Sequence, residues 1–287
     1  MPLSLVRISR QEALKRFLEE DIGQGDVTTL AIVPPDQKAS GHFVAKAPLV
    51  LAGIDLAIDA LTLLDESLVI ESHRWDGEEL NEGERAASVR GQARALLTGE
   101  RVATNLLQRL CGIATLTKRF VEAVRGTQAK ILDTRKTTPG LRVFEKYAVT
   151  VGGGINHRFG LDDAILIKDN HIRLAGGISA AIETARQHES RQHRFEVEVT
   201  TLEELEEALR YDLDAILLDN MDPGTVRRAV TCVRAHERGN KIVVEASGGM
   251  NLYNVRAFAE AGVDWISIGA LTNAATALDM SFKIHPA

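Results

Sequence analysis

Cysteine is scarce in this sequence. The 287 residues include two cysteines, Cys111 and Cys232, which lack the paired spacing of a zinc site or a redox motif. A chain of this length buries a sizeable core without disulfides or structural metals. The two thiols are therefore interpreted as ordinary buried cysteines, and they predict a reducing compartment, the cytoplasm.

Long hydrophobic runs and excess positive charge are also missing. No apolar run reaches membrane-spanning length, and the N-terminal "MPLSLVRISR" lacks the apolar stretch of a signal peptide. The formal net charge is −6, which disfavours a nucleic-acid partner and requires that any anion site be a local cluster of cations. The balance of 45% hydrophobic and 26% charged residues is that of an ordinary globular protein.

The first part of the chain has the pattern of an α+β domain. Residues 10–21, "RQEALKRFLEED", have helical spacing, and residues 54–64, "IDLAIDALTLL", form a second apolar helix. Around that second helix, residues 41–96 contain short strand-like segments separated by Gly or Asp-Gly turns, and "ERAASVRGQARALL" is included among them. We expect a mainly antiparallel sheet here.

From about residue 113, apolar runs alternate with amphipathic helices. The expected strands are 129–134, 163–168, 194–199, 214–219, 241–246 and 264–269. The expected helices between them start at Ser179, Thr201, Asp222 and Asn251. Such repeats predict a parallel sheet covered by helices, in a closed or partly open α/β barrel. A doubly wound open sheet is less favoured because no G-x-G-x-x-G follows the first strand.

Polar residues follow almost every expected strand of this second part. In α/β barrels, the carboxyl ends of the strands and their loops form the active site. The residues at those ends, with two from the loop after the first strand, are Thr134, Arg135, Lys136, His157, Arg158, Lys168, Glu198, Asp219, Ser247, Gly248, Gly249, Gly269 and Ala270.

Each of these residues alone is weak support for a site. A cation at a strand end is most often solvated, and His157 alone is more often a hydrogen-bonded loop residue. Glu198 could pair with a neighbouring cation, and Glu196 on the same strand face is an alternative participant. Charge at nearly every strand end is harder to explain structurally, so the set as a whole predicts a site.

The residue types indicate what this site binds. Clustered cations repel one another unless a multiply charged anion lies between them, and arginines match carboxylates and phosphates. Gly248, Gly249 and Gly269 let backbone N–H groups approach a phosphate. Glu198 and Asp219 suit Mg²⁺ or sugar hydroxyls. Together they favour glycosyl transfer with loss of pyrophosphate, from a phosphorylated sugar to a carboxylated acceptor.

At these residues the sequence resembles a known family. The segments "DTRKTTPGLR", "EKYAVTVGGGINHRFGLDDAILIKDNHI", "EVEV", "LLDNM", "EASGG" and "DWISIGALT" resemble quinolinate phosphoribosyltransferase, as do "EDIGQGDVTT", "FVAKAPLVLAG" and "ERVATNLLQRLCGIAT". The resemblance covers nearly the whole chain. It implies an N-terminal sandwich-like α/β domain over residues 1–112, joined by the tail 271–287, and an open α/β barrel over 113–270.

The resemblance also implies a reaction and a set of roles. Quinolinate and phosphoribosyl pyrophosphate would give nicotinate mononucleotide, pyrophosphate and CO₂, with Mg²⁺ as cofactor. Lys136, Lys168, Glu198 and Asp219 would act in catalysis, the last two facing ribose and Mg²⁺. The substrates would also contact Arg135, His157 and Arg158, the turn of Ser247, Gly248 and Gly249, and Gly269 with Ala270. Arg101 would come from the partner subunit of a homodimer with shared sites, or of a higher oligomer. Asn273 stands where relatives would carry His or another polar residue.

Three alternatives remain open at the level of sequence. A paralogous subfamily associated with molybdate transport shares the scaffold and would take another substrate, although the full set of cations favours a dianionic acid. Lys168 at a strand end could instead form a Schiff base. A degenerate barrel could also bind the anion without catalysis.

Overall fold

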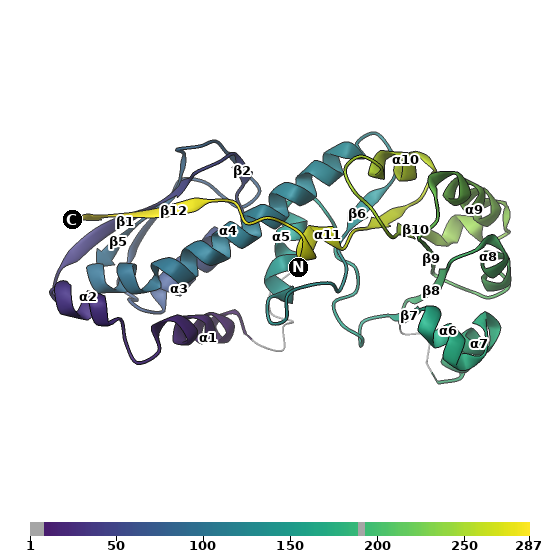
Figure 1. The fold of residues 1–287 in the computed structure, drawn as a ribbon, viewed down its shortest axis with the longest axis horizontal. Coiled ribbons are helices and arrows are strands. Elements are labelled where there is room, and N and C mark those ends of the chain that lie inside the picture. Colours follow the sequence, from purple (N-terminus) through teal and green to yellow (C-terminus); the bar gives the residue numbers. More distant parts are fainter. Residues whose placement is uncertain (1–8, 189–192) are drawn as a thin grey trace. The chain divides into compact units, whose positions relative to one another are not determined.

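The computed structural model describes residues 9–188 and 193–287. Residues 1–8 lie outside that range. They make up most of the N-terminal segment "MPLSLVRISR", for which the sequence predicted that there is no signal peptide. Contacts divide the chain into two compact units (Figure 1). Unit 1 consists of Met1–Leu116, Val143–Gly152 and Ala275–Ala287, and unit 2 consists of Thr117–Arg142 and Gly153–Ala274. Among the described residues, no helix combines the length and apolarity needed to span a membrane.

Unit 1 is built on an antiparallel sheet. Its strand order is β12-β1-β5-β3, and β2 pairs with β4. Its elements are α1 (Arg10–Ile22), α2 (Val27–Ile32), β1 (Lys38–Ala45), β2 (Leu49–Val50), α3 (Ile54–Thr62), β3 (Val69–Ser72), β4 (Glu79–Leu80), β5 (Arg85–Gln92), α4 (Ala93–Ala123), α5 (Arg142–Val151) and β12 (Met280–Pro286). The expected antiparallel sheet is confirmed, and the tail joins it through β12.

The strand prediction for one segment is wrong in the second half of that segment. The segment "ERAASVRGQARALL" was expected to be strand-like throughout, but β5 ends at Gln92 and the long helix α4 begins at Ala93. Residues from Ala93 onward are rich in Ala, Leu and Arg, which favour helix, and their apolar positions recur at helical spacing. The buried Leu96, Ala103 and Leu107 of α4 pack with α3 and the sheet in one apolar cluster.

Helix α5 belongs to unit 1, although the sequence assigned residues 113–270 to one continuous domain. The Phe144 ring lies 6.0 Å from the Phe17 ring, edge to face. Glu145 is fully buried and forms an ion pair of 2.7 Å with Arg109 of α4. The Tyr147 hydroxyl donates a 2.6 Å hydrogen bond to an Asp76 carboxylate oxygen, and burial is the main reason that the pKa of Tyr147 is raised.

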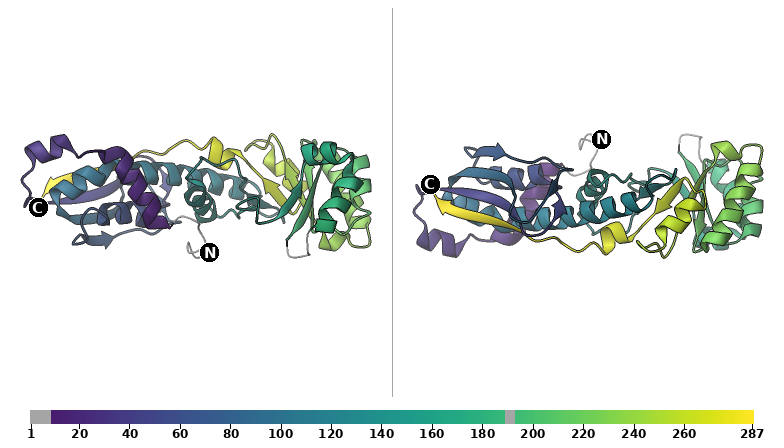
Figure 2. Two further views of the ribbon diagram at one scale, coloured as in Figure 1. Left: turned by 90° about the horizontal axis from the view of Figure 1, so that it is seen from below. Right: turned by 90° about the horizontal axis from the view of Figure 1, so that it is seen from above.

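Unit 2 is an open, parallel α/β structure, as predicted. Its six strands run in the order β6-β11-β10-β9-β8-β7, so β6 and β7 are the two edges. The strands are β6 (Lys130–Leu132), β7 (Ile165–Ile167), β8 (Phe195–Val199), β9 (Ala215–Asp219), β10 (Val243–Ser247) and β11 (Trp265–Ser267). The helices are α6 (Asp169–Ala175), α7 (Ile178–His188), α8 (Leu202–Ala208), α9 (Pro223–Ala235), α10 (Val255–Glu260) and α11 (Ala270–Asn273). Helices α8 and α9 cover the outer face of the sheet (Figure 2).

The helix starts follow capping chemistry in most places. Thr201 and Asp222 accept backbone hydrogen bonds at the starts of α8 and α9, as predicted. Asn251 was expected to cap a helix, but α10 starts at Val255. The Asn251 side chain instead accepts from the N–H groups of Tyr253 and Asn254, which forms a turn before the helix. The other expected start, Ser179, lies one residue inside α7.

Candidate active site

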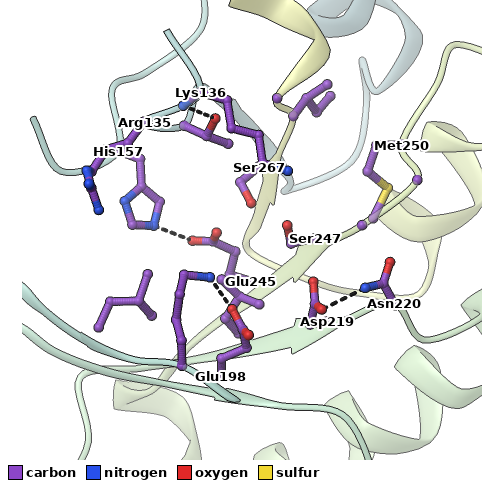
Figure 3. A pocket seen from close by; sticks show the side chains of 18 of the residues that line it. Arg135, Lys136, His157, Glu198, Asp219, Asn220, Glu245, Ser247, Met250 and Ser267 are labelled. Atoms are coloured by element: carbon purple, nitrogen blue, oxygen red, sulfur yellow. Dashed lines mark hydrogen bonds and ion pairs between the residues drawn. The ribbon is translucent and has the colours of Figure 1, made fainter. Parts of the chain in front are cut away.

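A cavity of about 750 Å³ opens within unit 2 at the carboxyl ends of the parallel strands (Figure 3). The sequence-predicted residues that line it are Thr134, Arg135, Lys136, His157, Arg158, Lys168, Glu198, Asp219, Ser247, Gly248, Gly249, Gly269 and Ala270. Parallel strands bring their carboxyl ends to one edge, which is why residues so distant in sequence meet here. The predicted convergence of the strand ends is observed. Asn273 also lines the cavity.

The loop after β6 presents the adjacent cations Arg135 and Lys136. The Thr134 hydroxyl accepts a 3.0 Å hydrogen bond from the Lys136 N–H, and the Thr272 hydroxyl donates one of 2.8 Å to the Lys136 carbonyl. These bonds fix the backbone and leave both side chains for the cavity. A Cβ at Gly269 would lie 2.9 Å from the Lys136 side chain, so glycine keeps the path of that lysine open.

Two arginines, Arg135 and Arg158, bring positive charge to the cavity. Arg158 donates a 2.9 Å hydrogen bond to the Ala164 carbonyl. Burial, and after it the charge of Arg135, lowers the pKa of Arg158. The Nε of Arg135 is buried and has no hydrogen-bond partner among the described residues. Two half-buried like charges, one of them with an unused buried donor, are features of a receptor for an anion.

Two carboxylates face these cations from the neighbouring strands. Lys168, after β7, forms a close ion pair with Glu198 of β8. Asp219 ends β9 and accepts a 2.7 Å hydrogen bond from the Asn220 amide. Burial first, and then the neighbouring Glu198 carboxylate, raises the pKa of Asp219, while Lys168 and Lys136 act in the opposite direction. Glu198 and Asp219 are therefore close enough to interact electrostatically.

These two carboxylates suit a divalent cation. The donor set consists of hard oxygens, which Mg²⁺ prefers. A divalent cation would also offset both the burial and the smaller repulsion by Glu198 that raise the pKa of Asp219. The predicted metal residues Glu198 and Asp219 thus fit the ion chemically.

The turn after β10 brings backbone N–H groups to the cavity. Gly248 has a φ of 99° and Gly249 a φ of 61°, in the left-handed region that favours glycine. Asn220, after β9, has a φ of 55° and donates its N–H to the Ser247 carbonyl at 3.0 Å. This hydrogen bond joins the ends of β9 and β10 beside the cavity. The glycine turn next to it has the composition of a phosphate-binding turn.

Replacing Gly248 by alanine is expected to destabilise the protein by roughly 1–3 kcal/mol. A Cβ at Gly248 would lie 2.2 Å from the Asn220 side-chain oxygen and 2.9 Å from the Asn220 nitrogen. Gly126→Ala is the control, because Gly126 has a similar φ of 83° but open space around it. Urea unfolding of both variants measures the difference. Equal losses of stability would show that the contact with Asn220 is unimportant.

The sequence prediction missed three polar residues of the cavity: Asn220, Glu245 and Ser267. A signal for Glu245 was present in "VVEAS", because alternate residues of a strand share a face and Ser247 had already been placed at the site. The same rule connects Glu196 with Glu198. Glu196 and Glu245 lie near the His157 imidazole, at 3.5 and 3.3 Å from its Nε2. Burial first, and then Glu245, raises the pKa of Glu196.

Arg101 is the one predicted site residue that belongs to unit 1. It lies in α4, and its side chain is exposed. The cavity is lined by residues of unit 2. The expected contribution of Arg101 to a partner's site remains a prediction.

A cavity at the carboxyl ends of parallel strands, lined by cations, carboxylates and glycine turns, is the site expected of a class of α/β enzymes that act on multiply charged small molecules. Comparison with protein families specifies the member of that class. The chain belongs to the quinolinate phosphoribosyl transferase family: the N-terminal domain of that family matches residues 26–111 and its C-terminal domain matches residues 113–283.

Individual relatives agree with the family assignment. A probable carboxylating nicotinate-nucleotide pyrophosphorylase of Bacillus subtilis is 45% identical over 274 residues, which cover 96% of this chain and 93% of the relative. The carboxylating nicotinate-nucleotide pyrophosphorylase of Mycobacterium leprae is 42% identical, with 96% of each chain covered. The crystal structure of NadC from Streptococcus pyogenes superposes with a TM-score of 0.90 at 40% identity, covering 96% of this chain and 95% of that one. These matches confirm the predicted fold class.

Proposed function

We propose that this protein transfers the phosphoribosyl group of phosphoribosyl pyrophosphate to quinolinate, with release of pyrophosphate and CO₂, to give nicotinate mononucleotide for NAD biosynthesis. The observation that supports this most directly is the cavity itself, in which Arg135 and Arg158 lie with two lysines and three carboxylates. The names of the B. subtilis and M. leprae relatives describe the same reaction.

The charges of the cavity match those that develop in such a reaction. Cleavage at the anomeric carbon of the ribose leaves positive charge on the sugar and negative charge on the departing pyrophosphate. Lys136 and Lys168 would stabilise the leaving group, and Glu198 and Asp219 would stabilise the cationic sugar. The pyridine nitrogen of quinolinate is the nucleophile, so no side chain needs to form a covalent bond. When the adjacent carboxylate then leaves as CO₂, the electron pair stays on the ring carbon, where the positive pyridinium nitrogen stabilises it, and that carbon takes up a proton to give the product.

Three further parts of the site complete the proposal. The turn of Ser247, Gly248 and Gly249, with Gly269 and Ala270, would hold the 5′-phosphate through backbone N–H groups. Glu198 and Asp219 would hold Mg²⁺, which neutralises charge on pyrophosphate when it is bound. Lys168 would act as an ammonium ion, because it is paired with Glu198, and that pairing disfavours the Schiff-base alternative.

The proposed assembly is a homodimer with shared active sites, in which Arg101 of each chain completes the cavity of the other. The exposed position of Arg101 on α4 is compatible with a role between chains. The proposed location is the cytoplasm, which the free thiols of Cys111 and Cys232 support.

Quinolinate is expected to be a far better substrate than nicotinate. Nicotinate lacks one carboxylate, so a cation among Arg135, Lys136 and Arg158 would be left unpaired in a partly buried site, at a cost of roughly 3–5 kcal/mol, or at least about a hundredfold in kcat/KM. Pyrophosphate release with each acid measures the ratio. Equal rates with the two acids would contradict the proposed substrate, and release of no pyrophosphate with either would contradict the proposed reaction.

A further inference from the structure

Two glutamates and a histidine form a buried polar cluster at the floor of the cavity. The side chains of Glu196 and Glu245 are 2% and 0% exposed, and that of His157 is 9% exposed. Glu196 is the second residue of β8 and Glu245 is the central residue of β10, and a parallel sheet usually carries apolar residues at such positions. Burying two carboxylates costs free energy, so this cluster requires a reason beyond packing.

Both nitrogens of the His157 ring face protein groups. The Nδ1 atom accepts a 2.8 Å hydrogen bond from the Arg158 backbone N–H, so Nδ1 carries no proton in this arrangement. The Nε2 atom then carries the hydrogen and faces the carboxylates. It lies 3.3 Å from a Glu245 oxygen (Figure 3) and 3.5 Å from a Glu196 oxygen. Neither Glu245 oxygen has a hydrogen-bond partner among the described residues, so the contact with the ring is electrostatic. A ring held in this way is poorly placed to exchange a proton with a substrate. Protein groups instead hold the ring on both sides, and we call these contacts of His157 the anchor.

The anchored element is the loop that carries Arg158. The His157 backbone N–H donates a 2.9 Å hydrogen bond to the buried Asp133, which follows β6. Together with the ring contacts, this ties residues 157 and 158 to the strand ends of β6 and to the interiors of β8 and β10. Arg158 extends from the anchored backbone to a position where the charge of Arg135 lowers its pKa.

We propose that Glu245, with Glu196, is a positioning residue: through His157 it holds the Arg158 loop so that Arg158 and Arg135 together receive a substrate with two carboxylates. This inference rests on the proposed function and identifies what sets the preference for a diacid. The charged groups around the cluster are Arg194, whose guanidinium lies 4.0 Å from Glu196 and stacks on Trp265, and Arg158 on the cavity side. Loss of the anchor would move Arg158 without removing it.

The variant Glu245→Ala tests the positioning role, because KM for quinolinate and kcat should respond differently to it. We expect the KM for quinolinate to rise by about tenfold or more, and the preference over nicotinate to fall by a similar factor, because misplacing a binding group by about 1 Å is costly. The KM for phosphoribosyl pyrophosphate and kcat should stay within about threefold of wild type. Glu245→Gln should restore the quinolinate KM, since its amide oxygen keeps partial negative charge facing the Nε2–H group.

Val244→Ala is the matched control, because Val244 is a fully buried neighbour on the same strand whose side chain points to the opposite face. It should lower the melting temperature but leave the quinolinate KM unchanged. If Val244→Ala raises that KM as much as Glu245→Ala does, or if Glu245→Gln is as impaired as Glu245→Ala, the positioning role is wrong.

Two measurements do not depend on substrate turnover. Hydrogen exchange of the loop 156–164 should increase in Glu245→Ala and not in Val244→Ala, even if the protein does not use quinolinate. Unchanged exchange in that loop would overturn the anchor, whereas absent pyrophosphate release by the wild type would overturn only the proposed function.

Metal analysis of purified wild-type protein is the second measurement, because the ligand atoms of the cluster lie within 4.8 Å of one another. If the wild type contains one metal ion per chain and Glu245→Gln contains none, the cluster is a metal site and the anchor is wrong.

Discussion

Asp219→Ala is expected to lower kcat by at least about a hundredfold and to leave the fold intact, and Glu198→Ala should do the same. Both side chains line the cavity, where we expect them to act on the charge around the ribose. Asp219 is half-buried at the end of β9, and Glu198 is buried and paired with Lys168. Pyrophosphate release gives kcat, and circular dichroism melting curves give the state of the fold. Activity should also be lost on treatment with a chelator and return with added Mg²⁺.

Asp222→Ala provides the control for this pair. Asp222 lies three residues after Asp219 and caps α9 with hydrogen bonds to Gly224 and Thr225, outside the cavity lining. Its loss should cost about 1 kcal/mol of stability and leave kcat nearly unchanged. Full activity in both cavity variants, or full activity after chelation, would contradict the assigned metal and ribose roles of Glu198 and Asp219.

Mixed dimers are expected to recover activity from two inactive variants. Arg101→Ala and Lys136→Ala homodimers should each be nearly inactive, because each site of the proposed dimer needs both residues. Unfolded and refolded together, they should form mixed dimers in which one site carries both substitutions and the other carries neither. With random pairing, about half the dimers are mixed and half of their sites are intact, which gives about a quarter of the wild-type activity.

Mass spectrometry must show that the mixed dimers have formed. Refolded wild-type protein corrects for incomplete recovery, and Arg125→Ala, which replaces an exposed arginine of unit 2 that does not line the cavity, tests for nonspecific effects of charge removal. If proven mixed dimers stay inactive, Arg101 acts in its own chain's site or outside the site.

The sequence determined the local elements and the inventory of the site. The apolar run "AILLD" became β9, and "EVEV", in which valine alternates with glutamate, became part of β8. Thr201 and Asp222 cap the helices that follow these strands. Placing polar residues at strand ends was enough to find most of the cavity, because parallel strands necessarily carry their carboxyl ends to one edge. This argument needs only periodicity and chain direction.

Contacts between distant segments were decided by tertiary structure. The sequence of α5 has the same helical spacing as the barrel helices. Its assignment to unit 1 comes from tertiary contacts, among them the ring contact of Phe144 with Phe17, the ion pair of Glu145 with Arg109 and the hydrogen bond of Tyr147 to Asp76. Likewise, α4 begins where β5 ends because its apolar side packs into a core that includes α3 and the sheet. Periodicity indicates that one face of a helix will be buried, but it does not predict which element that face packs against.

The role of His157 shows the same limit within the site. The sequence placed His157 among the substrate-binding residues by its position in a loop, but the use of its ring depends on Glu196 and Glu245, which are 39 and 88 residues away. Hydrogen bonds are short and directional, so whether a nitrogen faces a ligand or a buried carboxylate is settled by ångström-scale packing of three strands. Residue type and spacing along the chain contain no such distances, and only the folded arrangement of β6, β8 and β10 supplies them.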